Sequence, residues 1–178
     1  GFYKRVGPDR EIWAIDWKTL EYHPAAKPRF PSVDAARQIE DLPQRLRTLV
    51  AFNDRAGSLL WKLFSDVFIY SAERIPEISD RIVEIDRAMR WGYGQTYGPF
   101  ELWDALGFNE VCERIEKEGR RLPESIEMML REAATSFYRA PDRDGHPHKQ
   151  FFHLTRSGYA EVAYARPREW FANFQYEF

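Results

Sequence analysis

The stretch "IDRAMRWGYGQTYGPFELWDALG", Ile85 to Gly107, holds four of the chain's ten glycines. Such a segment can cradle a phosphate or can turn the chain between two helices. A phosphate loop needs its glycines directly after a strand and before a helix, so that free N–H groups face the anion. Here the glycines follow a helical pattern, and no Lys-Ser or Lys-Thr pair follows them. We therefore interpret the stretch as a helix–helix corner and expect no anion on its amides.

The special residues of the corner fit this interpretation. Gly92 or Gly94 can supply the positive φ that ends a helix, and Gly107 can end the next one. Pro99 suits the first turn of that second helix, because an N–H at this position has no helical partner. The side chains expected to point inward are those of Phe100 and of Leu102 or Trp103.

The residues before the corner predict an amphipathic helix that follows Pro76. Its apolar stripe consists of Ile78, Ile82, Ile85 and Met89, at helical spacing. The pairs Glu77–Arg81 and Asp86–Arg90 are expected on its outer surface as i,i+4 ion pairs.

The segment from Asp54 to Ile75 predicts the longest helix, about 33 Å in length at the usual rise per residue. Large apolar residues nearly encircle it, so we expect it to be the central and most buried element. These residues are Leu59, Leu60, Trp61, Leu63, Phe64, Val67, Phe68, Ile69 and Tyr70.

Shorter helices are predicted on both sides of these two. The N-cap candidates are Ser32 for a helix to Ile39, Asp41 for a helix with Pro43 in its first turn, and Asn109 for a helix that Gly119 ends. A last helix is predicted over Pro123–Thr135, with Ile126, Met129, Leu130 and Ala133 inward.

The two ends of the chain resemble each other and do not look helical. "FYKR" at residues 2–5 and "FYRA" at residues 137–140 are each followed by a Gly/Pro/Asp turn and an apolar-aromatic run. The spans from Tyr3 to Tyr22 and from Tyr138 to Tyr159 differ by two residues, which a loop can absorb. We expect a hairpin at each end and an internal repeat, in which the first arm closes a module that precedes this sequence.

The predicted fold is therefore mainly α, a helical bundle with short β-hairpin arms at both ends. Residues 1–31 would form the tail of a preceding module and a Pro-rich linker, residues 32–135 the helical module, and residues 136–178 the closing arm and an aromatic tail. The 178 residues carry a formal net charge of −2, which gives no electrostatic footprint for nucleic acid. No run approaches the roughly 18 apolar residues of a membrane span.

Other constellations favour structural interpretations. His146, His148 and His153 could bind a metal, but "DRDG" and Pro147 beside them are typical of a solvated hairpin tip. Cys112 is the only cysteine, so no internal disulfide can form, and the acidic residues beside it oppose a reactive thiolate.

The corner and the helix before it resemble the signature of the C-terminal domain of 3-hydroxyacyl-CoA dehydrogenases. Modules of that family carry an Ile-Asp-x-Ala-Met helix, a Gly-rich turn and Gly-Pro-Phe-Glu-Leu-x-Asp-x-x-Gly. The matching residues are Ile85, Asp86, Ala88, Met89, Gly92, Gly94, Gly98, Pro99, Phe100, Glu101, Leu102, Asp104 and Gly107. A looser resemblance runs from Phe2 to about Ala140 and is greatest to the longer bacterial type, in which two such modules follow the NAD-binding domain.

The resemblance implies a parent enzyme of fatty acid β-oxidation that oxidises 3-hydroxyacyl-CoA to 3-oxoacyl-CoA. NAD would be bound in an upstream domain, outside this sequence. No residue here matches the family's Gly-x-Gly-x-x-Gly turn or its catalytic His-Glu pair, so no catalytic, cofactor-binding or metal residue is assigned. The expected partners are the upstream NAD-binding domain, a first C-terminal module, the acyl-CoA substrate and a second subunit. The parent enzyme is expected in the bacterial cytoplasm or, as an alternative, in the mitochondrial matrix.

Five residues of the corner are candidates for the wall of an acyl or pantetheine cleft, through the resemblance alone. They are Tyr93, Tyr97, Gly98, Pro99 and Phe100. Core packing around the corner is the alternative role for the same side chains. An alternative for the whole chain is a free-standing helical binding or assembly module without enzyme activity.

Overall fold

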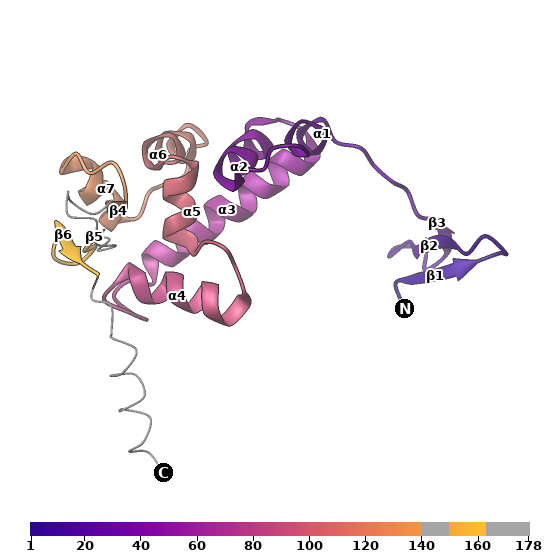
Figure 1. Cartoon of the computed structure of the whole chain (residues 1–178), viewed down its shortest axis with the longest axis horizontal. Helices are drawn as coiled ribbons and strands as arrows, with labels where there is room; N and C mark the ends of the chain where they lie inside the picture. The colour runs from indigo at the N-terminus through magenta and orange to yellow at the C-terminus, as the bar shows by residue number, and fades with distance from the viewer. Residues whose placement is uncertain (140–149, 163–178) are drawn as a thin grey trace, which may run out of the picture.

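The chain folds into a helical body with a three-stranded antiparallel sheet at each end (Figure 1). This computed structural model describes residues 1–139 and 150–162. The helices are α1 (Pro31–Ala36), α2 (Leu42–Ala51), α3 (Arg55–Glu73), α4 (Ile82–Tyr93), α5 (Pro99–Leu106), α6 (Phe108–Lys117) and α7 (Glu124–Arg131). The strands are β1 (Tyr3–Val6), β2 (Glu11–Ile15), β3 (Tyr22–Pro24), β4 (Tyr138–Arg139), β5 (Gln150–Phe152) and β6 (Tyr159–Glu161). The prediction of a mainly α fold with β arms is confirmed.

Several helix ends lie where local chemistry predicts them. Asp41 caps α2 by accepting a hydrogen bond from the backbone N of Gln44 at 2.8 Å. Asp54 caps α3 in the same way, with the backbone N of Gly57 as donor at 2.8 Å. Gly94 ends α4 with φ +66°, in the left-handed region that glycine adopts without strain.

Other predicted helix starts were wrong. Ser32 lies inside α1 rather than at its N-cap, and its backbone N and hydroxyl both donate to Asp54, at 2.8 and 2.9 Å. Asn109 lies inside α6, whose N-cap is Gly107. The predicted helix after Pro76 begins only at Ile82, so Ile78 lies in a turn and is exposed.

The last predicted helix is also shorter than expected. It spans Glu124–Arg131 rather than Pro123–Thr135. Ile126 and Met129 are fully buried, as predicted, whereas Ala133 is exposed and has a positive φ of 53°. The chain therefore leaves the helix before Ala133 and turns into the strand of the C-terminal sheet.

Helix α3 is not buried all round, and this corrects the prediction. One side packs on the body through fully buried Phe68 and nearly buried Trp61. The other side carries an exposed apolar stripe at spacings of four, four and three residues, namely Leu59, Leu63, Val67 and Tyr70, which are 58%, 50%, 43% and 60% exposed. This surface is a candidate interface, because folded monomers rarely leave such a row uncovered.

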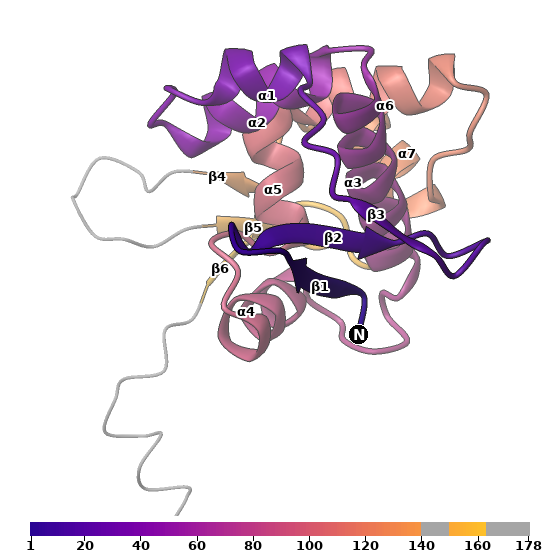
Figure 2. The same ribbon diagram turned by 90° about the vertical axis from the view of Figure 1, so that its right-hand side faces the viewer.

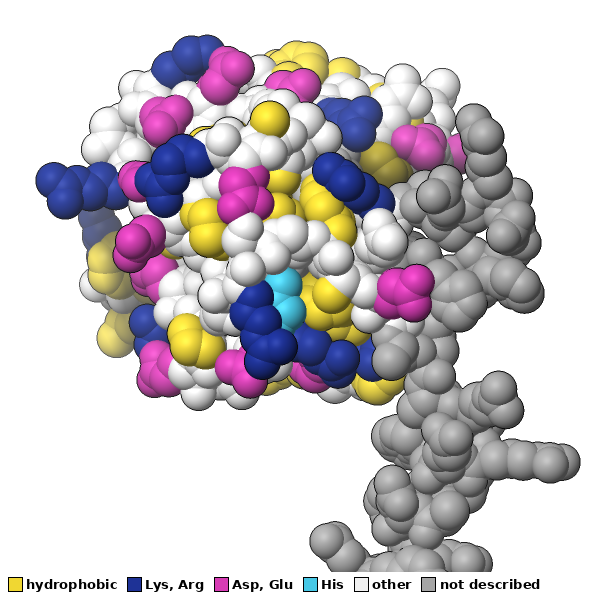
Figure 3. Space-filling model, turned by 90° about the vertical axis from the view of Figure 1, so that its left-hand side faces the viewer, with side chains coloured by type: hydrophobic (Ala, Val, Ile, Leu, Met, Phe, Trp, Pro, Cys, Tyr) yellow, Lys and Arg dark blue, Asp and Glu magenta, His cyan; other side chains and the backbone are white. Residues whose placement is uncertain are grey.

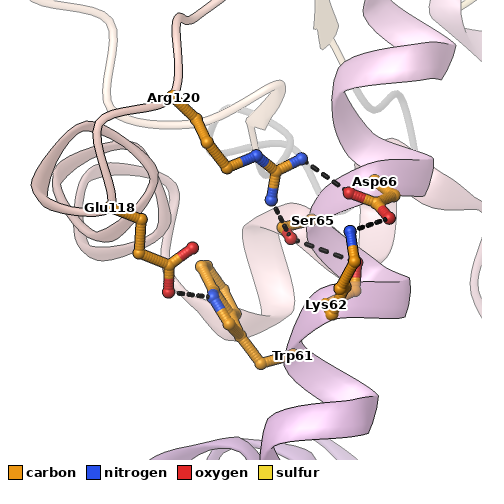
Figure 4. A network of polar contacts seen from close by, with 6 residues as sticks. All are labelled: Trp61, Lys62, Ser65, Asp66, Glu118 and Arg120. Atoms are coloured by element: carbon orange, nitrogen blue, oxygen red, sulfur yellow. Dashed lines mark hydrogen bonds and ion pairs between the residues drawn. The ribbon is translucent and has the colours of Figure 1, made fainter.

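A polar network fixes the packed side of α3 to the chain that follows α6 (Figure 4). Arg120 donates to the hydroxyl of Ser65 at 2.6 Å and to the carboxylate of Asp66 at 2.7 Å. Trp61 donates its indole N–H to Glu118 at 2.5 Å. Ser65 is fully buried, and its hydroxyl accepts from Arg120 while it donates to the carbonyl oxygen of Lys62 at 3.2 Å, so this buried group is fully hydrogen-bonded.

The sheets at the two ends have the same order and the same register. In the N-terminal sheet Tyr3 pairs with Ala14, and Ile15 pairs with Tyr22. In the C-terminal sheet Tyr138 pairs with Phe151, and Phe152 pairs with Tyr159. Each arm is thus a sheet of three strands, one more than the predicted hairpin, and the two tyrosine pairs noted in the sequence occupy equivalent places.

The two arms differ in their placement. The C-terminal sheet lies beside α4 and α5 (Figure 2), with residue contacts between α4 and β5. The N-terminal sheet stands apart from the helices at the end of an extended connector, residues 25–30 (Figure 1). No helix in the described part of the chain is long and apolar enough to cross a membrane.

Candidate functional site: the helix corner and its docked arm

The corner between α4 and α5 is built around the buried carboxylate of Asp86. This residue is on α4 and is only 2% exposed. One of its oxygens accepts a hydrogen bond from the backbone N of Phe100 at 2.9 Å, and the other accepts one from the N of Glu101 at 3.3 Å. A carboxylate of the protein itself therefore occupies the N-terminal amides of α5, where a helix attracts anions.

This position bears on two expectations. The amides of the corner already bind the carboxyl group of Asp86, so they are engaged and offer no phosphate cradle. Asp86 is also not on the outer surface beside Arg90. Arg90 instead donates to Glu101 on the next helix, at 3.0 Å. Local i,i+4 spacing failed here because the turn at Gly94–Gly98 brings a second helix against this side of α4.

Gly98 is required at the N-cap of α5 because two helices approach closely there. A Cβ atom at this residue would lie 2.2 Å from a carboxylate oxygen of Asp86 and 2.3 Å from its Cα. No side-chain rotation of Asp86 can relieve a contact with its backbone. Glu101 completes the turn by accepting from the Gly98 backbone N at 3.1 Å.

A second carboxylate on α5 holds the C-terminal arm, which we define as residues 136–139 and 150–162. Asp104 accepts hydrogen bonds from the backbone N atoms of Phe137 and Tyr138, both at 2.8 Å. The phenol of Tyr138 then donates to Asp86 at 2.6 Å. Two aspartates on adjacent helices therefore bind the first residues of one arm.

The side chain of Phe137 fills an aromatic pocket beneath these bonds. Its ring meets those of Phe100, Trp103 and Phe108 edge-on, at centroid distances of 4.9, 5.2 and 5.2 Å. All four side chains are almost completely buried. Edge-to-face aromatic pairs of this kind contribute roughly 0.5–1.5 kcal/mol each beyond their buried area.

Burial dominates the electrostatics of the corner. It raises the pKa of Asp86 to about 7, although the bonds from Tyr138 and Phe100 favour the charged carboxylate. Burial and the carboxylate of Asp86 also raise the pKa of Tyr138 far above its ordinary value. The phenol therefore remains protonated and acts as the donor of the pair.

The five candidate cleft residues divide into two groups. Gly98, Pro99 and Phe100 are buried and belong to the packing of the corner. Tyr93 is 78% exposed at the end of α4, and Tyr97 is half-buried in the turn. Any contact with a ligand from this set would therefore come from the two tyrosines. A hollow of about 490 Å³ lies elsewhere, between the end of α3 and α7.

Groups that could bind a metal or act as a nucleophile are not assembled in the described residues. No cluster of three or more His, Cys, Asp or Glu side chains suited to a metal occurs within them. His146 and His148 lie outside the described residues, whereas burial lowers the pKa of His153. Burial raises the pKa of Cys112 to about 12, which keeps its thiol protonated.

The described surface mixes charges of both signs. Figure 3 shows basic and acidic side chains interspersed with hydrophobic patches on one face of the molecule. The part of that face that the structure describes shows no broad single-sign area of the kind that attracts nucleic acid.

Sequence reasoning missed the structural roles of Asp86, Asp104 and Tyr138. A buried aspartate on a helix face has no local sign in the sequence, because its partners lie 14 to 52 positions away. The sequence did contain one signal for these roles, namely that many positions of the family signature are matched within this short stretch. Asp86, Gly98, Glu101 and Asp104 all match it, and in this chain each one binds or contacts another part of the corner.

Comparison with known proteins finds relatives of one kind. The chain is 41% identical over 138 residues to the "Probable 3-hydroxyacyl-CoA dehydrogenase" of Bacillus subtilis, a match that covers 78% of the chain and 17% of that protein. It is 31% identical over 131 residues, 71% of the chain, to a protein of Rickettsia prowazekii provisionally named as a fatty acid oxidation complex trifunctional enzyme, and covers 17% of its length. A protein of Rickettsia felis with the same name is 27% identical over 98 residues, 53% of the chain and 14% of that protein.

The chain thus spans less than a fifth of the length of each of these relatives. No family profile matches it, and no solved structure does. The matches nevertheless agree with one another and with the signature at the corner. This chain belongs to the 3-hydroxyacyl-CoA dehydrogenase family, as the homologue of one segment of it.

Proposed function

We propose that this chain is a helical module of an NAD-dependent enzyme that oxidises the 3-hydroxyl group of fatty acyl-CoA to a ketone. The observation that carries the proposal is the 41% identity to a segment of the Bacillus subtilis protein. NAD binds outside these residues, in a preceding domain, and the protein acts in the bacterial cytoplasm. This placement agrees with the bacterial origin of the relatives.

The module's task is to scaffold the enzyme rather than to perform its chemistry. The polar groups of the corner support this role, because Asp86 and Asp104 bind backbone groups of neighbouring elements, and Glu101 accepts from Arg90 on α4. The exposed apolar stripe of α3 is the surface that packs against another module or subunit. Residues 32–135 form the module, preceded by the tail of another and followed by a closing arm.

Tyr93 and Tyr97 are the groups of the module that reach the acyl or pantetheine chain. Tyr93 is exposed and Tyr97 is half-buried at the turn between α4 and α5, so a surface of each ring is open to form one wall of a cleft. Tyr97→Ala in the full gene product is expected to raise KM for 3-hydroxyacyl-CoA without changing Tm. An unchanged KM together with an unchanged Tm would remove Tyr97 from the cleft.

The whole proposal is tested by assaying hydride transfer with NAD and a 3-hydroxyacyl-CoA. The full gene product is expected to reduce NAD, and the 178-residue chain alone is expected to be inactive. Turnover by the 178-residue chain alone would contradict the proposal that catalysis and NAD binding belong to another domain. A gene without an upstream nucleotide-binding domain, and a product without activity, would favour a free-standing assembly module.

A further inference from the structure

The two arms of the chain share one set of internal bonds. The phenol of Tyr22 donates to the carbonyl oxygen of Gly1 at 2.6 Å, and the phenol of Tyr159 donates to that of Ser136 at 2.6 Å. Each acceptor lies two residues before the tyrosine that opens the first strand, Tyr3 in one arm and Tyr138 in the other. The two arms are therefore equivalent, with Phe2 in the place of Phe137.

Further contacts repeat at equivalent positions. The backbone N of Ile15 donates to Phe2 at 3.0 Å, and that of Phe152 donates to Phe137 at 2.8 Å. A basic side chain stacks on the tyrosine in both arms, Lys4 on Tyr22 at 4.1 Å and Arg139 on Tyr159 at 3.5 Å. Leu20 and Ser157 occupy equivalent positions with φ of 60° and 62°.

Only one of these two sheets is docked. In the C-terminal arm Phe137 is 0% exposed and Leu154 is 5% exposed. Their equivalents in the N-terminal arm, which we define as residues 1–25, are Phe2 and Trp17, and each is 79% exposed. The N-terminal arm thus leaves in solvent the same apolar positions that the C-terminal arm buries against the helical body.

The helical body of this chain cannot accept the N-terminal arm. Its aromatic pocket already holds Phe137, and Asp104 already accepts from the amides of Phe137 and Tyr138. A second copy of the chain would present the same filled pocket. The free arm therefore requires a different body with an empty pocket of the same type.

We propose that the N-terminal arm docks on another helical module of the full gene product, through a helix corner of the α4–α5 type. Phe2 enters an aromatic pocket there. One carboxylate, equivalent to Asp104, accepts from the amides of Phe2 and Tyr3, and a second, equivalent to Asp86, accepts from the phenol of Tyr3. Trp17 packs on that module at the site that corresponds to the one where Leu154 packs on the helical body of this chain. This assignment rests on the proposed function for the existence of a second module and derives its contacts from the docked arm.

Hydrogen exchange measured by mass spectrometry tests the docking. The amides of residues 2–6 are expected to exchange at least about tenfold more slowly in the full gene product than in the 178-residue chain, because docking protects them. Phe2→Ala in the full product is expected to abolish this difference and to lower Tm by roughly 5–15 °C. Leu20→Ala is the matched control, since Leu20 is exposed and its equivalent Ser157 stays exposed in the docked arm.

The comparison of the two wild-type proteins needs no variant, so a misfolded Phe2→Ala protein leaves the test intact. Equal exchange in both proteins would overturn the proposal, as would a gene product without a second pair of acidic residues aligned with Asp86 and Asp104. Protection that appears in the 178-residue chain at high concentration would also overturn it, in favour of a second copy. An active dehydrogenase with an unprotected arm would refute the docking alone, and a protected arm in an inactive protein would refute only the proposed function.

Discussion

The phenol oxygen of Tyr138 lies 2.6 Å from a carboxylate oxygen of Asp86, although 52 positions separate the two residues in the chain. The same carboxylate accepts from the first amides of α5. One buried acid therefore joins α4, α5 and the C-terminal arm, and its charge state contributes to the stability of all three.

Stability should depend on the ionisation of Asp86. Burial raises its pKa from 3.8 to about 7, so the folded protein binds this proton more tightly than the unfolded chain. The stability that the group contributes is fully present below pH 4 and is lost as pH rises towards 7. The Asn side chain does not titrate, so we expect the Tm of Asp86→Asn minus that of wild type to increase from pH 5 to pH 8. Thermal unfolding followed by circular dichroism measures this difference.

The matched control for this experiment is Asp66→Asn. A hydrogen bond from Lys62 lowers the pKa of Asp66, so this group does not titrate between pH 5 and 8. The Tm difference between Asp66→Asn and wild type should be constant over the range. Parallel Tm curves for Asp86→Asn and wild type would show that Asp86 is ionised throughout.

Two glycines of the corner should respond in opposite ways to alanine. Gly98→Ala places a Cβ against the backbone of Asp86, and we expect a loss of about 2–4 kcal/mol in the free energy of unfolding, in the range of strained core substitutions. Gly92 lies on α4 with nothing near its Cβ position, so Gly92→Ala should gain about 0.5–1 kcal/mol from helix propensity. Urea unfolding of both variants measures the two values, and similar values would refute the close approach.

The pocket around Phe137 should carry much of the stability of the C-terminal end. Phe137→Ala removes the ring that Phe100, Trp103 and Phe108 surround, and the cost should be about 3–5 kcal/mol. Tyr93→Ala, at a 78% exposed aromatic residue, should change the free energy of unfolding by less than about 0.5 kcal/mol. A small effect of Phe137→Ala would mean that the arm contributes little to folding.

Cys112 should be unreactive in the folded protein. It is 2% exposed, and burial raises its pKa to about 12, so neither access nor thiolate is available at pH 8. A thiol reagent such as Ellman's reagent should modify it only in denaturant. Rapid modification of the folded chain at pH 8 would be incompatible with this burial.

The ion pair between Arg120 and Asp66 should contribute little by itself. Their side chains are 29% and 46% exposed, which leaves both partly hydrated. A double-mutant cycle of Arg120→Ala and Asp66→Ala should give a coupling of about 0.2–1 kcal/mol that falls with salt. A larger and salt-independent coupling would contradict this expectation and show that the pair is shielded from water.

The parts of the fold that local rules govern could be predicted from the sequence. Asp41 caps a helix, Gly94 and Gly107 end helices, and Pro99 begins one, because each role depends only on neighbouring residues. The likeness of the two ends was also visible, since Tyr3 and Tyr138 open strands that pair in the same register.

The parts that depend on distant partners could not be predicted. Asp86 was expected on the surface, because its helical spacing from Arg90 is local and its bond to Tyr138 is not. Helix α3 was expected to be covered all round, whereas the described body covers one side and leaves Leu59 and Tyr70 exposed. The cleft role of Tyr93 and Tyr97 stays a prediction that kinetics in the full protein will decide.

The likeness of the two arms has a thermodynamic consequence. The N-terminal sheet already has, while free, the hydrogen bonds that its counterpart has when seated, such as that from Tyr22 to Gly1. Most of its backbone conformational entropy is therefore already lost before docking, so association would require little further ordering of the arm. The docking proposed above would therefore require no folding step in the arm itself.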